Sequence, residues 1–226
     1  MANSDFLRKN KNQHSIKNAI SKKMDSDIDV AIRKLIVYLH RKYPHLVLEH
    51  KKILPLTEII ADLSRQYPQY AKSFSPVMRE SFIKPDGGFL YATDKKGNRK
   101  LILVAEVKRQ GTNDKRLSEG LPKQAKGNAI ERLGKNLTGI RAIFKKESMI
   151  PFVCFGSGDD FQKGSTILDR VVTMNDFFPL NEVFIEKEHL PFEPVSMFFR
   201  YKDWSTNEMI KIMAGVAEEA ISYHFR

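Results

Sequence analysis

The chain has 226 residues, of which 42% are hydrophobic and 29% charged, and this balance favours a folded domain and excludes a disordered chain. Its formal net charge of +11 predicts a polyanionic partner, with nucleic acid the first candidate and an anionic membrane surface the second. No apolar run approaches the ~18 residues needed to span a bilayer, and a single cysteine, Cys154, excludes an intrachain disulfide and a cysteine-based zinc site.

The first part of the chain differs in composition from the rest. Residues 1–26 are rich in Lys, Asn and Ser and poor in large apolar side chains, which predicts a basic, flexible arm. This arm either contacts DNA phosphates or is a disordered tail without a role. Residues 27–226 are expected to form a single α/β domain. The polar N-terminus and the lone cysteine indicate a cytoplasmic location.

Two helices are predicted at the start of that domain. From Asp27, apolar residues between Ile28 and Leu39 recur at spacings of three and four, which is the period of one helical face. The pattern stops before Tyr43-Pro44, because proline disfavours helical backbone in the residue that precedes it. A second apolar stripe predicts a helix over residues 56–66, again followed by a Tyr-Pro pair.

The middle of the chain predicts a β-hairpin. Residues 82–91 have the composition of an extended segment with a Gly-Gly kink, residues 95–98 form a turn, and residues 100–108 form a strand. The first half of this second strand is continuously apolar, as in a strand covered on both faces. At its end Glu106 and Lys108 share one face, because successive side chains of a strand point to opposite sides.

The remaining elements complete an α/β pattern. A helix is expected from Asn128 to about Lys145, and Ser205 with Glu208 forms a capping box that opens a last helix, from about Thr206 to Tyr223. Cys154 lies in an apolar run, so it is expected to be a small buried hydrophobe and not a nucleophile. Further strands are expected at residues 152–155, 183–185 and 195–201. Together these elements predict a central β-sheet flanked by helices.

Three charged residues of the hairpin form the most informative pattern. Asp86 follows Pro85 on one strand, and Glu106-Val107-Lys108 ends the next, so two carboxylates and an ammonium are expected to converge. A divalent cation on such carboxylates can neutralise a leaving oxyanion and activate water for phosphodiester cleavage. The alternative is a strand end that reaches solvent, with Glu106 and Lys108 as an ordinary surface pair. A charged pair on so apolar a strand favours the nuclease interpretation.

A second pattern indicates DNA recognition. Lys126-Gly127-Asn128 opens a helix and Arg132 follows one turn later, so both Asn128 and Arg132 can project from the same helix end. Asparagine can pair with the N6/N7 edge of adenine, and a helix start in the major groove is a common way to read bases. The alternative is structural, with Asn128 as a helix cap and Arg132 as a solvated side chain.

Taken together, these segments resemble the EcoRI family of type II restriction endonucleases, within the PD-(D/E)xK nuclease superfamily. The resemblance covers roughly residues 80–226 and rests on three motifs in one order. These are Ile83–Gly88, Leu103–Gly111, and Gly127–Arg132 with Lys135-Asn136 beyond. The resemblance implies a restriction-endonuclease-like core with a central mixed sheet. It also implies Mg²⁺-dependent cleavage of double-stranded DNA at a palindrome with an AATT core, leaving 5′ overhangs.

The resemblance implies roles for individual residues and partners for the protein. Asp86 and Glu106 would be the Mg²⁺ ligands and Lys108 the catalytic lysine, while Asn128 and Arg132 would read adenines of the AATT core. Lys84 would contact phosphate, Ala129 would pack on a thymine, Glu131 would orient an arginine across the dimer, and Arg109, Gln110, Lys126, Gly127 and Arg170 would complete the DNA-binding set. The partners would be double-stranded DNA and a second copy of the chain in a homodimer. A bacterial host would also need a companion DNA methyltransferase.

One departure from the family pattern concerns the outer base pair of the recognition site. In the family, two arginines three residues apart late in the chain help to read that pair. Arg170 matches the second arginine, whereas Ile167 stands at the first. Isoleucine has no side-chain hydrogen-bond donor. The AATT core is therefore expected to be read while the outer pair is read differently or loosely.

Two other functions stay open at this point. A repair or recombination nuclease could use the same Asp–Glu–Lys centre with little choice of sequence, although the element at residues 127–132 argues against it. A non-enzymatic DNA-binding module could keep the carboxylates for structure alone. Loss of cleavage on substitution of Glu106 would separate an enzyme from such a module.

Overall fold

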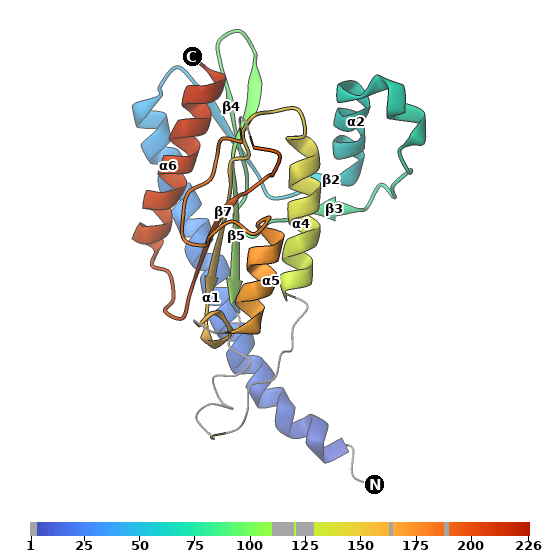
Figure 1. Cartoon of the computed structure of the whole chain (residues 1–226). Coiled ribbons are helices and arrows are strands. Elements are labelled where there is room, and N and C mark those ends of the chain that lie inside the picture. Colours follow the sequence, from blue (N-terminus) through green and yellow to red (C-terminus); the bar gives the residue numbers. More distant parts are fainter. Residues whose placement is uncertain (1–3, 110–119, 121–128, 163–164, 188–189) are drawn as a thin grey trace.

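The computed structural model describes residues 4–109, 120, 129–162, 165–187 and 190–226, with side chains from Lys23 onward except that of Ala129. Its main sheet has five strands in the order β1-β4-β5-β6-β7, and a separate pair joins β2 to β3. The first three strands of the main sheet pair antiparallel, while β5, β6 and β7 pair parallel. The predicted central mixed sheet is thus confirmed (Figure 1).

The strands have the following bounds. The main sheet comprises β1 (Val47–Lys51), β4 (Gly88–Thr93), β5 (Arg99–Arg109), β6 (Phe152–Ser157) and β7 (Ser196–Arg200), and the small pair comprises β2 (Leu54–Pro55) and β3 (Phe82–Ile83). The predicted hairpin is confirmed as β4 and β5. Its first arm differs from the prediction, because the Pro85–Gly88 turn divides residues 82–91 into β3 and β4.

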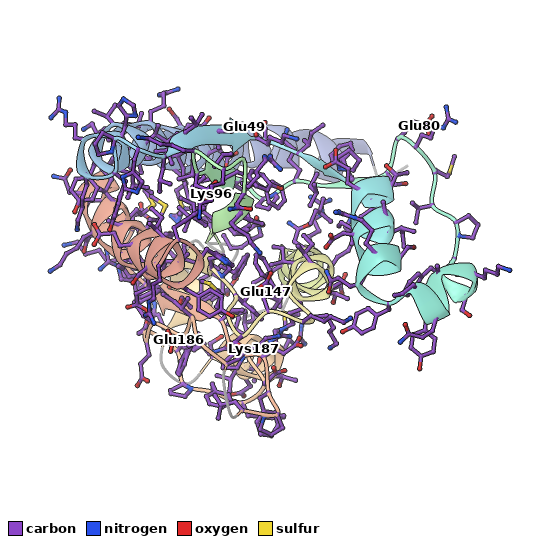
Figure 2. The ribbon with its side chains drawn as sticks, turned by 90° about the horizontal axis from the view of Figure 1, so that it is seen from above. Glu49, Glu80, Lys96, Glu147, Glu186 and Lys187 are labelled. Atoms are coloured by element: carbon purple, nitrogen blue, oxygen red, sulfur yellow. The ribbon has the colours of Figure 1, made fainter. Side chains whose placement is uncertain are left out.

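Helices cover both faces of this sheet, as predicted. The helices are α1 (Ser4–Lys42), α2 (Leu56–Gln66), α4 (Ala129–Ile143), α5 (Thr166–Met174) and α6 (Thr206–His224), with two short 3-10 helices, η1 (Pro68–Ser73) and η2 (Asp159–Phe161). Figure 2 looks down on the end that carries Lys96 and Glu147, with α1 and α6 on one side and α4 and α2 on the other. Among the described residues, no helix has both the length and the hydropathy needed to cross a membrane.

The central strand β5 separates two hydrophobic cores. Leu103, Ala105 and Val107 pack into the core shared with α1 and α6, whereas Val104 packs into the core shared with α2, α4 and α5. Every residue from Leu101 to Val107 is buried. This double coverage explains the continuous apolar run of the sequence, and it carries Glu106 into the interior with that run.

Several other predictions can be compared with the structure. Helix α2 spans Leu56–Gln66, and the capping box of α6 has both of its hydrogen bonds, between Ser205 and Glu208. Cys154 is fully buried, as expected for a small apolar side chain. The helix expected over residues 128–145 is described as α4, from Ala129 to Ile143.

Two predicted elements differ from the structure. The strand expected at residues 183–185 is wrong, because the backbone of Phe184 hydrogen-bonds the side chain of Ser196 and the β-pairing nearby is an isolated bridge between Met149 and Glu186. The helix expected from Asp27 begins at Ser4, because apolar periodicity reports the face that packs and not the helical turns before it. The flexibility of residues 1–26 and the division at residue 27 stay predictions.

Two glycine positions offer a test of the packing between β6 and β7. A Cβ atom at Gly156 would overlap the ring of Phe199, whereas one at Gly215, exposed on α6, would meet no atom within 4 Å. Gly156→Ala is therefore expected to lower the free energy of unfolding by about 1–3 kcal/mol. Gly215→Ala is expected to raise it by up to ~1 kcal/mol, because alanine is the better helix former. Urea denaturation measures both, and an unchanged midpoint for Gly156→Ala would contradict the packing described.

Candidate active site

The three charged residues predicted from the hairpin meet in the structure. The Nζ atom of Lys108 lies 2.9 Å from Oδ2 of Asp86 and also forms an ion pair with Oε1 of Glu106. The backbone N–H of Asp86 donates to Oε2 of Glu106 over 3.1 Å, and the N–H of Val107 donates to Oδ2 of Asp86 over 3.3 Å. The two carboxylates therefore point at one position, which the ammonium group fills.

Asp86 reaches this position because of the turn that precedes β4. The N–H of Gly87 donates to the carbonyl of Ala105 on β5, and the N–H of Gly88 donates back to the carbonyl of Pro85. Gly88 has a φ of +74°, which favours glycine, and a Cβ atom there would collide with the backbone of Lys51 on β1. The turn is thus pressed between β1 and β5, which sets Asp86 beside the end of β5.

The centre is buried. The side chain of Glu106 is 1% exposed and that of Lys108 13%, while Asp86 keeps 29% exposure and forms the open side. The interpretation of Glu106 and Lys108 as an ordinary surface pair is therefore wrong. A carboxylate this deep is costly unless charges and hydrogen bonds compensate it, and the neighbours described above supply both.

Burial also shifts the protonation of the centre. Burial raises the pKa of Glu106 to about 7, and the charge of Asp86 acts in the same direction, while Lys108 opposes the shift. For Lys108, burial alone would lower the pKa, but the charges of Glu106 and Asp86 outweigh it and raise the pKa above its usual range. Lys108 therefore keeps its positive charge at neutral pH, whereas Glu106 is poised to accept a proton.

One residue of the centre was not assigned a role from the sequence. The side-chain amide of Asn136, on α4 and 8% exposed, donates to Oε1 of Glu106 over 3.4 Å. A signal for it exists in the sequence. Asn136 adjoins Leu133, Leu137 and Ile140 on the apolar face of α4, and a polar side chain among buried positions indicates a specific hydrogen-bond partner.

The donor set of the centre fits a hard divalent cation. Asp86 and Glu106 supply carboxylate oxygens that already share one cationic group, the ammonium of Lys108. Mg²⁺ usually takes one or two protein carboxylates and completes its shell with water and phosphate. Two protein carboxylates, with the remaining positions open to water and phosphate, suit such an ion. Among the described residues, no group of three or more His, Cys, Asp or Glu side chains that could hold a metal is found.

The residues predicted to contact DNA differ in their exposure to solvent. Lys84, Glu131, Arg132 and Arg170 are exposed, while Arg109 is only 17% exposed and pairs with Asp203 over 3.7 Å. Figure 1 shows that α4 and α5 begin at the end of the sheet where β5 ends. Ala129 is the first described residue of α4. Gln110, Lys126, Gly127 and Asn128 lie outside the described residues.

The position that departs from the family pattern belongs to the core. Ile167 is 5% exposed on α5 and packs in the same hydrophobic core as Val171. Its backbone N–H donates to the side chain of Ser165, which caps the helix. Residue 167 therefore serves packing, whereas Arg170 on the same helix faces solvent.

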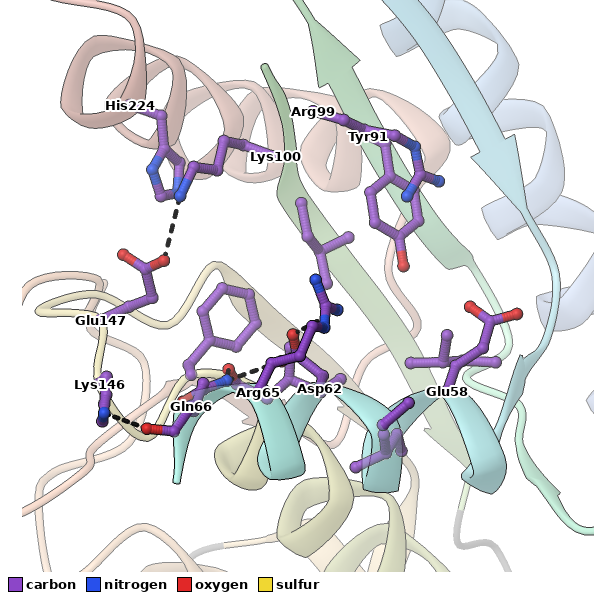
Figure 3. Close-up of a pocket in the computed structure, with 16 residues that line it drawn as sticks. Glu58, Asp62, Arg65, Gln66, Tyr91, Arg99, Lys100, Lys146, Glu147 and His224 are labelled. Carbon is purple, nitrogen blue, oxygen red and sulfur yellow. Dashed lines mark hydrogen bonds and ion pairs between the residues drawn. The ribbon is translucent and has the colours of Figure 1, made fainter. Parts of the chain in front are cut away.

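A cavity near α2 lies away from this centre. It has a volume of about 600 Å³ and lies between α2 and the start of β5, at the opposite end of that strand from Glu106 (Figure 3). Its charges are largely paired with one another, as in Lys100 with Glu147 and Arg65 with Asp62. Nothing in this cavity contributes to the Asp–Glu–Lys centre.

A mixed sheet whose central hairpin unites Asp86, Glu106 and Lys108 defines a nuclease of the PD-(D/E)xK type. The sequence model of the family described as "Restriction endonuclease EcoRI" matches residues 10–167. The chain therefore belongs to the EcoRI family of type II restriction endonucleases, which are site-specific deoxyribonucleases.

Two relatives illustrate the range of similarity. The type II restriction enzyme RsrI of Cereibacter sphaeroides is 25% identical, over 92% of this chain and 87% of the relative. The type II restriction enzyme EcoRI of Escherichia coli is 34% identical, over 54% of this chain and 47% of the relative. The first similarity extends over nearly the whole chain, and the second is concentrated in about half of it.

The raised pKa of Glu106 predicts a pH-dependent affinity for metal. A carboxylate must be deprotonated to bind a cation, so below a pKa of about 7 the proton competes with Mg²⁺. The affinity for Mg²⁺ is expected to fall about tenfold between pH 8 and pH 6, as one proton requires. Titration calorimetry of the protein without DNA measures it, with Glu106→Gln as the control that removes the dependence. An affinity that stays constant down to pH 5 would contradict the role of burial.

Proposed function

We propose that this restriction endonuclease cuts double-stranded DNA in a Mg²⁺-dependent reaction, at a palindrome with an AATT core, and leaves 5′ overhangs. The observation that supports the metal dependence most directly is the convergence of Asp86 and Glu106 on one cationic group. Membership of the EcoRI family and the net charge of +11 support DNA as the substrate.

In this proposal four residues of the centre have distinct roles. Asp86 and Glu106 bind the metal, which when present would neutralise charge on the phosphate and lower the pKa of a bound water. Lys108 keeps its charge because both carboxylates raise its pKa, so it can hold the scissile phosphate or orient the attacking water. Asn136 fixes the Oε1 atom of Glu106 by its amide hydrogen bond.

Sequence recognition is proposed to start at the N-terminal end of α4. Asn128 and Arg132 would read adenines of AATT, Ala129 would pack on a thymine, and Glu131 would orient an arginine. The remaining proposed DNA contacts are Lys84, Arg109, Gln110, Lys126, Gly127 and Arg170. Ile167 supports a different or looser reading of the outer base pair, because isoleucine has no side-chain donor and is buried at that position.

The assembly and setting of the enzyme also stay proposals. A palindromic site calls for a homodimer in which each subunit cuts one strand, because the symmetry of the protein then matches that of the DNA. A host that carries such an enzyme needs a companion DNA methyltransferase to protect its own sites. We also propose a bacterial cytoplasmic location, because the enzyme and the methyltransferase would act in the same host.

A less specific nuclease with the same centre is the alternative function. The family membership favours site-specific cleavage, and both relatives are named as type II restriction enzymes. Digestion of a plasmid separates the two functions, because discrete bands indicate a defined site and a smear indicates little sequence choice.

The catalytic assignment is tested by Glu106→Gln. Loss of the metal carboxylate is expected to slow cleavage by about 10³-fold, since a bound metal supplies several kcal/mol of transition-state stabilisation. Binding to an AATT-containing duplex is expected to persist, because the phosphate-binding lysines and arginines remain. Glu147→Gln makes the same chemical change at the far end of β5, where Glu147 pairs with Lys100, and should leave cleavage intact. Cleavage by Glu106→Gln at the rate of the unmodified protein would refute the assignment.

The specificity is tested by sequencing the ends of digested genomic DNA. Each end is expected to begin with the 5′ overhang of a site that contains AATT, with an outer base pair that differs from G·C or is variable. Cutting at GAATTC alone would refute the different or looser reading of the outer pair. Ends without AATT would refute the assigned core.

A further inference from the structure

Two side chains contact the backbone of the turn that carries Asp86. They belong to His50 on β1 and to Lys52, the residue that follows β1. The ammonium of Lys52 donates to the backbone carbonyl of Asp86 over 3.4 Å, and Nε2 of His50 lies 2.8 Å from the backbone carbonyl of Gly87. A carbonyl oxygen only accepts hydrogen bonds, so Nε2 of His50 carries the proton in this contact. Two consecutive carbonyls of the Pro-Asp-Gly-Gly turn are thus held from one neighbouring strand.

The positions of His50 and Lys52 follow from the alternation of side chains along extended chain. His50 and Lys52 are two residues apart and both reach the turn, whereas Lys51 between them lies over the ring of Tyr91, 5.9 Å from its centroid. Lys51 also pairs with Glu49 over 3.9 Å, away from the turn. Lys51 is therefore a matched control for Lys52, because it has the same charge but does not contact the Asp86 carbonyl.

Lys52 also contacts helix α1. Its ammonium forms an ion pair with Asp29 of α1, so it bridges that helix and the backbone of Asp86. Burial and the charge of Asp86 raise the pKa of Asp25, one turn earlier on α1, which indicates that this part of the helix lies beside the centre. The link from α1 through Lys52 to Asp86 is therefore a compact set of contacts.

The backbone of Asp86 is held at both of its polar groups. Its N–H donates to Glu106 over 3.1 Å, and its carbonyl accepts from Lys52. Fixing both groups restricts the rotation of the peptide units around the Cα atom and hence the direction in which the carboxylate leaves the chain. A partner that orients a metal ligand in this way typically contributes 10–100-fold in metal affinity or activity.

We propose that His50 and Lys52 are positioning residues that hold the Asp86–Gly87 backbone so that the Asp86 carboxylate faces Glu106. Neither residue touches the reacting atoms in this role. The proposal rests on the function proposed above, in which Asp86 is a metal ligand. It also separates Lys52 from the lysines that would bind DNA phosphate, because its contacts are with the turn and with Asp29.

The sign of the change in Mg²⁺ affinity tests the proposal for Lys52. Removing a positive charge beside the carboxylates would strengthen Mg²⁺ binding if Lys52 acted only by its charge. Loss of positioning would weaken it instead. In titration calorimetry without DNA, Lys52→Met is expected to bind Mg²⁺ about tenfold more weakly than the unmodified protein. Lys51→Met is expected to bind it equally well or more tightly, and Lys52→Arg is expected to restore most of the loss.

Cleavage kinetics provide a second readout. For Lys52→Met the rate at saturating DNA is expected to fall about tenfold and the half-saturating Mg²⁺ concentration to rise. The KM for DNA should change no more than in Lys51→Met. Equal or tighter Mg²⁺ binding by Lys52→Met, or a loss confined to KM, would overturn the proposal and identify Lys52 as a charge or a DNA contact.

The histidine is tested by a matched pair of variants. His50→Gln retains an N–H donor and is expected to keep most activity, whereas His50→Leu removes the donor and should reduce cleavage. The losses in His50→Leu and Lys52→Met are expected to be less than additive in the double variant, because both side chains hold one turn. Fully additive losses, or equal activity of His50→Gln and His50→Leu, would count against the shared role.

Failure of the proposed function can be told apart from failure of this inference. If the unmodified protein binds Mg²⁺ but does not cut AATT-containing DNA, the proposed function is wrong while the Mg²⁺ titrations still test Lys52. If the unmodified protein cuts and Lys52→Met matches it in rate and Mg²⁺ affinity, the inference alone is wrong. Circular dichroism and thermal unfolding check that each variant folds. Should Lys52→Met fail to fold, Lys52→Gln serves in its place.

Discussion

The structure depends on the compensation of one buried carboxylate, that of Glu106. An isolated charge at this depth is unfavourable by several kcal/mol, so it persists only where partners surround it. Lys108 comes from the same strand, the N–H of Asp86 from the preceding turn, and Asn136 from α4. Three parts of the chain that meet at Glu106 each supply a polar group, and the site is assembled by the same contacts that make its burial tolerable.

The arrangement of the sheet brings these groups together. β5 pairs antiparallel with β4, which delivers the Asp86 turn, and parallel with β6, which requires a connection on the face of α4. Because β5 has β4 on one side and β6 on the other, it lies in the middle of the sheet, where helices cover both faces. The same topology places the end of β5 and the starts of α4 and α5 at one end of the molecule, as Figure 1 shows. The Asp86–Glu106–Lys108 centre and the predicted recognition residues of α4 thus belong to one end of the fold.

Local patterns in the sequence predicted the hairpin, its Asp86–Glu106–Lys108 centre, α2 and the capped start of α6, because each depends on neighbouring residues. The contribution of β1 was not predicted. Its segment is an edge strand with polar residues on both faces, so it lacks the alternation that marks a half-buried strand. The contacts of His50 and Lys52 join residues more than thirty positions apart, and only the sheet register brings them together. For α5, the Ser165 cap was a signal, but the helix is short and its apolar stripe has few members.

The position of Ile167 shows how the core limits the side chains that α5 can carry. A side chain 5% exposed within the core of α5 cannot be exchanged for arginine without burying a guanidinium among Val171 and its neighbours. Such a charge is unfavourable unless a partner accompanies it. An arginine at residue 167 would therefore disturb the packing of α5. In the proposed function, any reading of the outer base pair from this helix comes from its exposed face, where Arg170 lies. The core on which α5 rests thus limits which residues of the helix that proposal can assign to the outer pair.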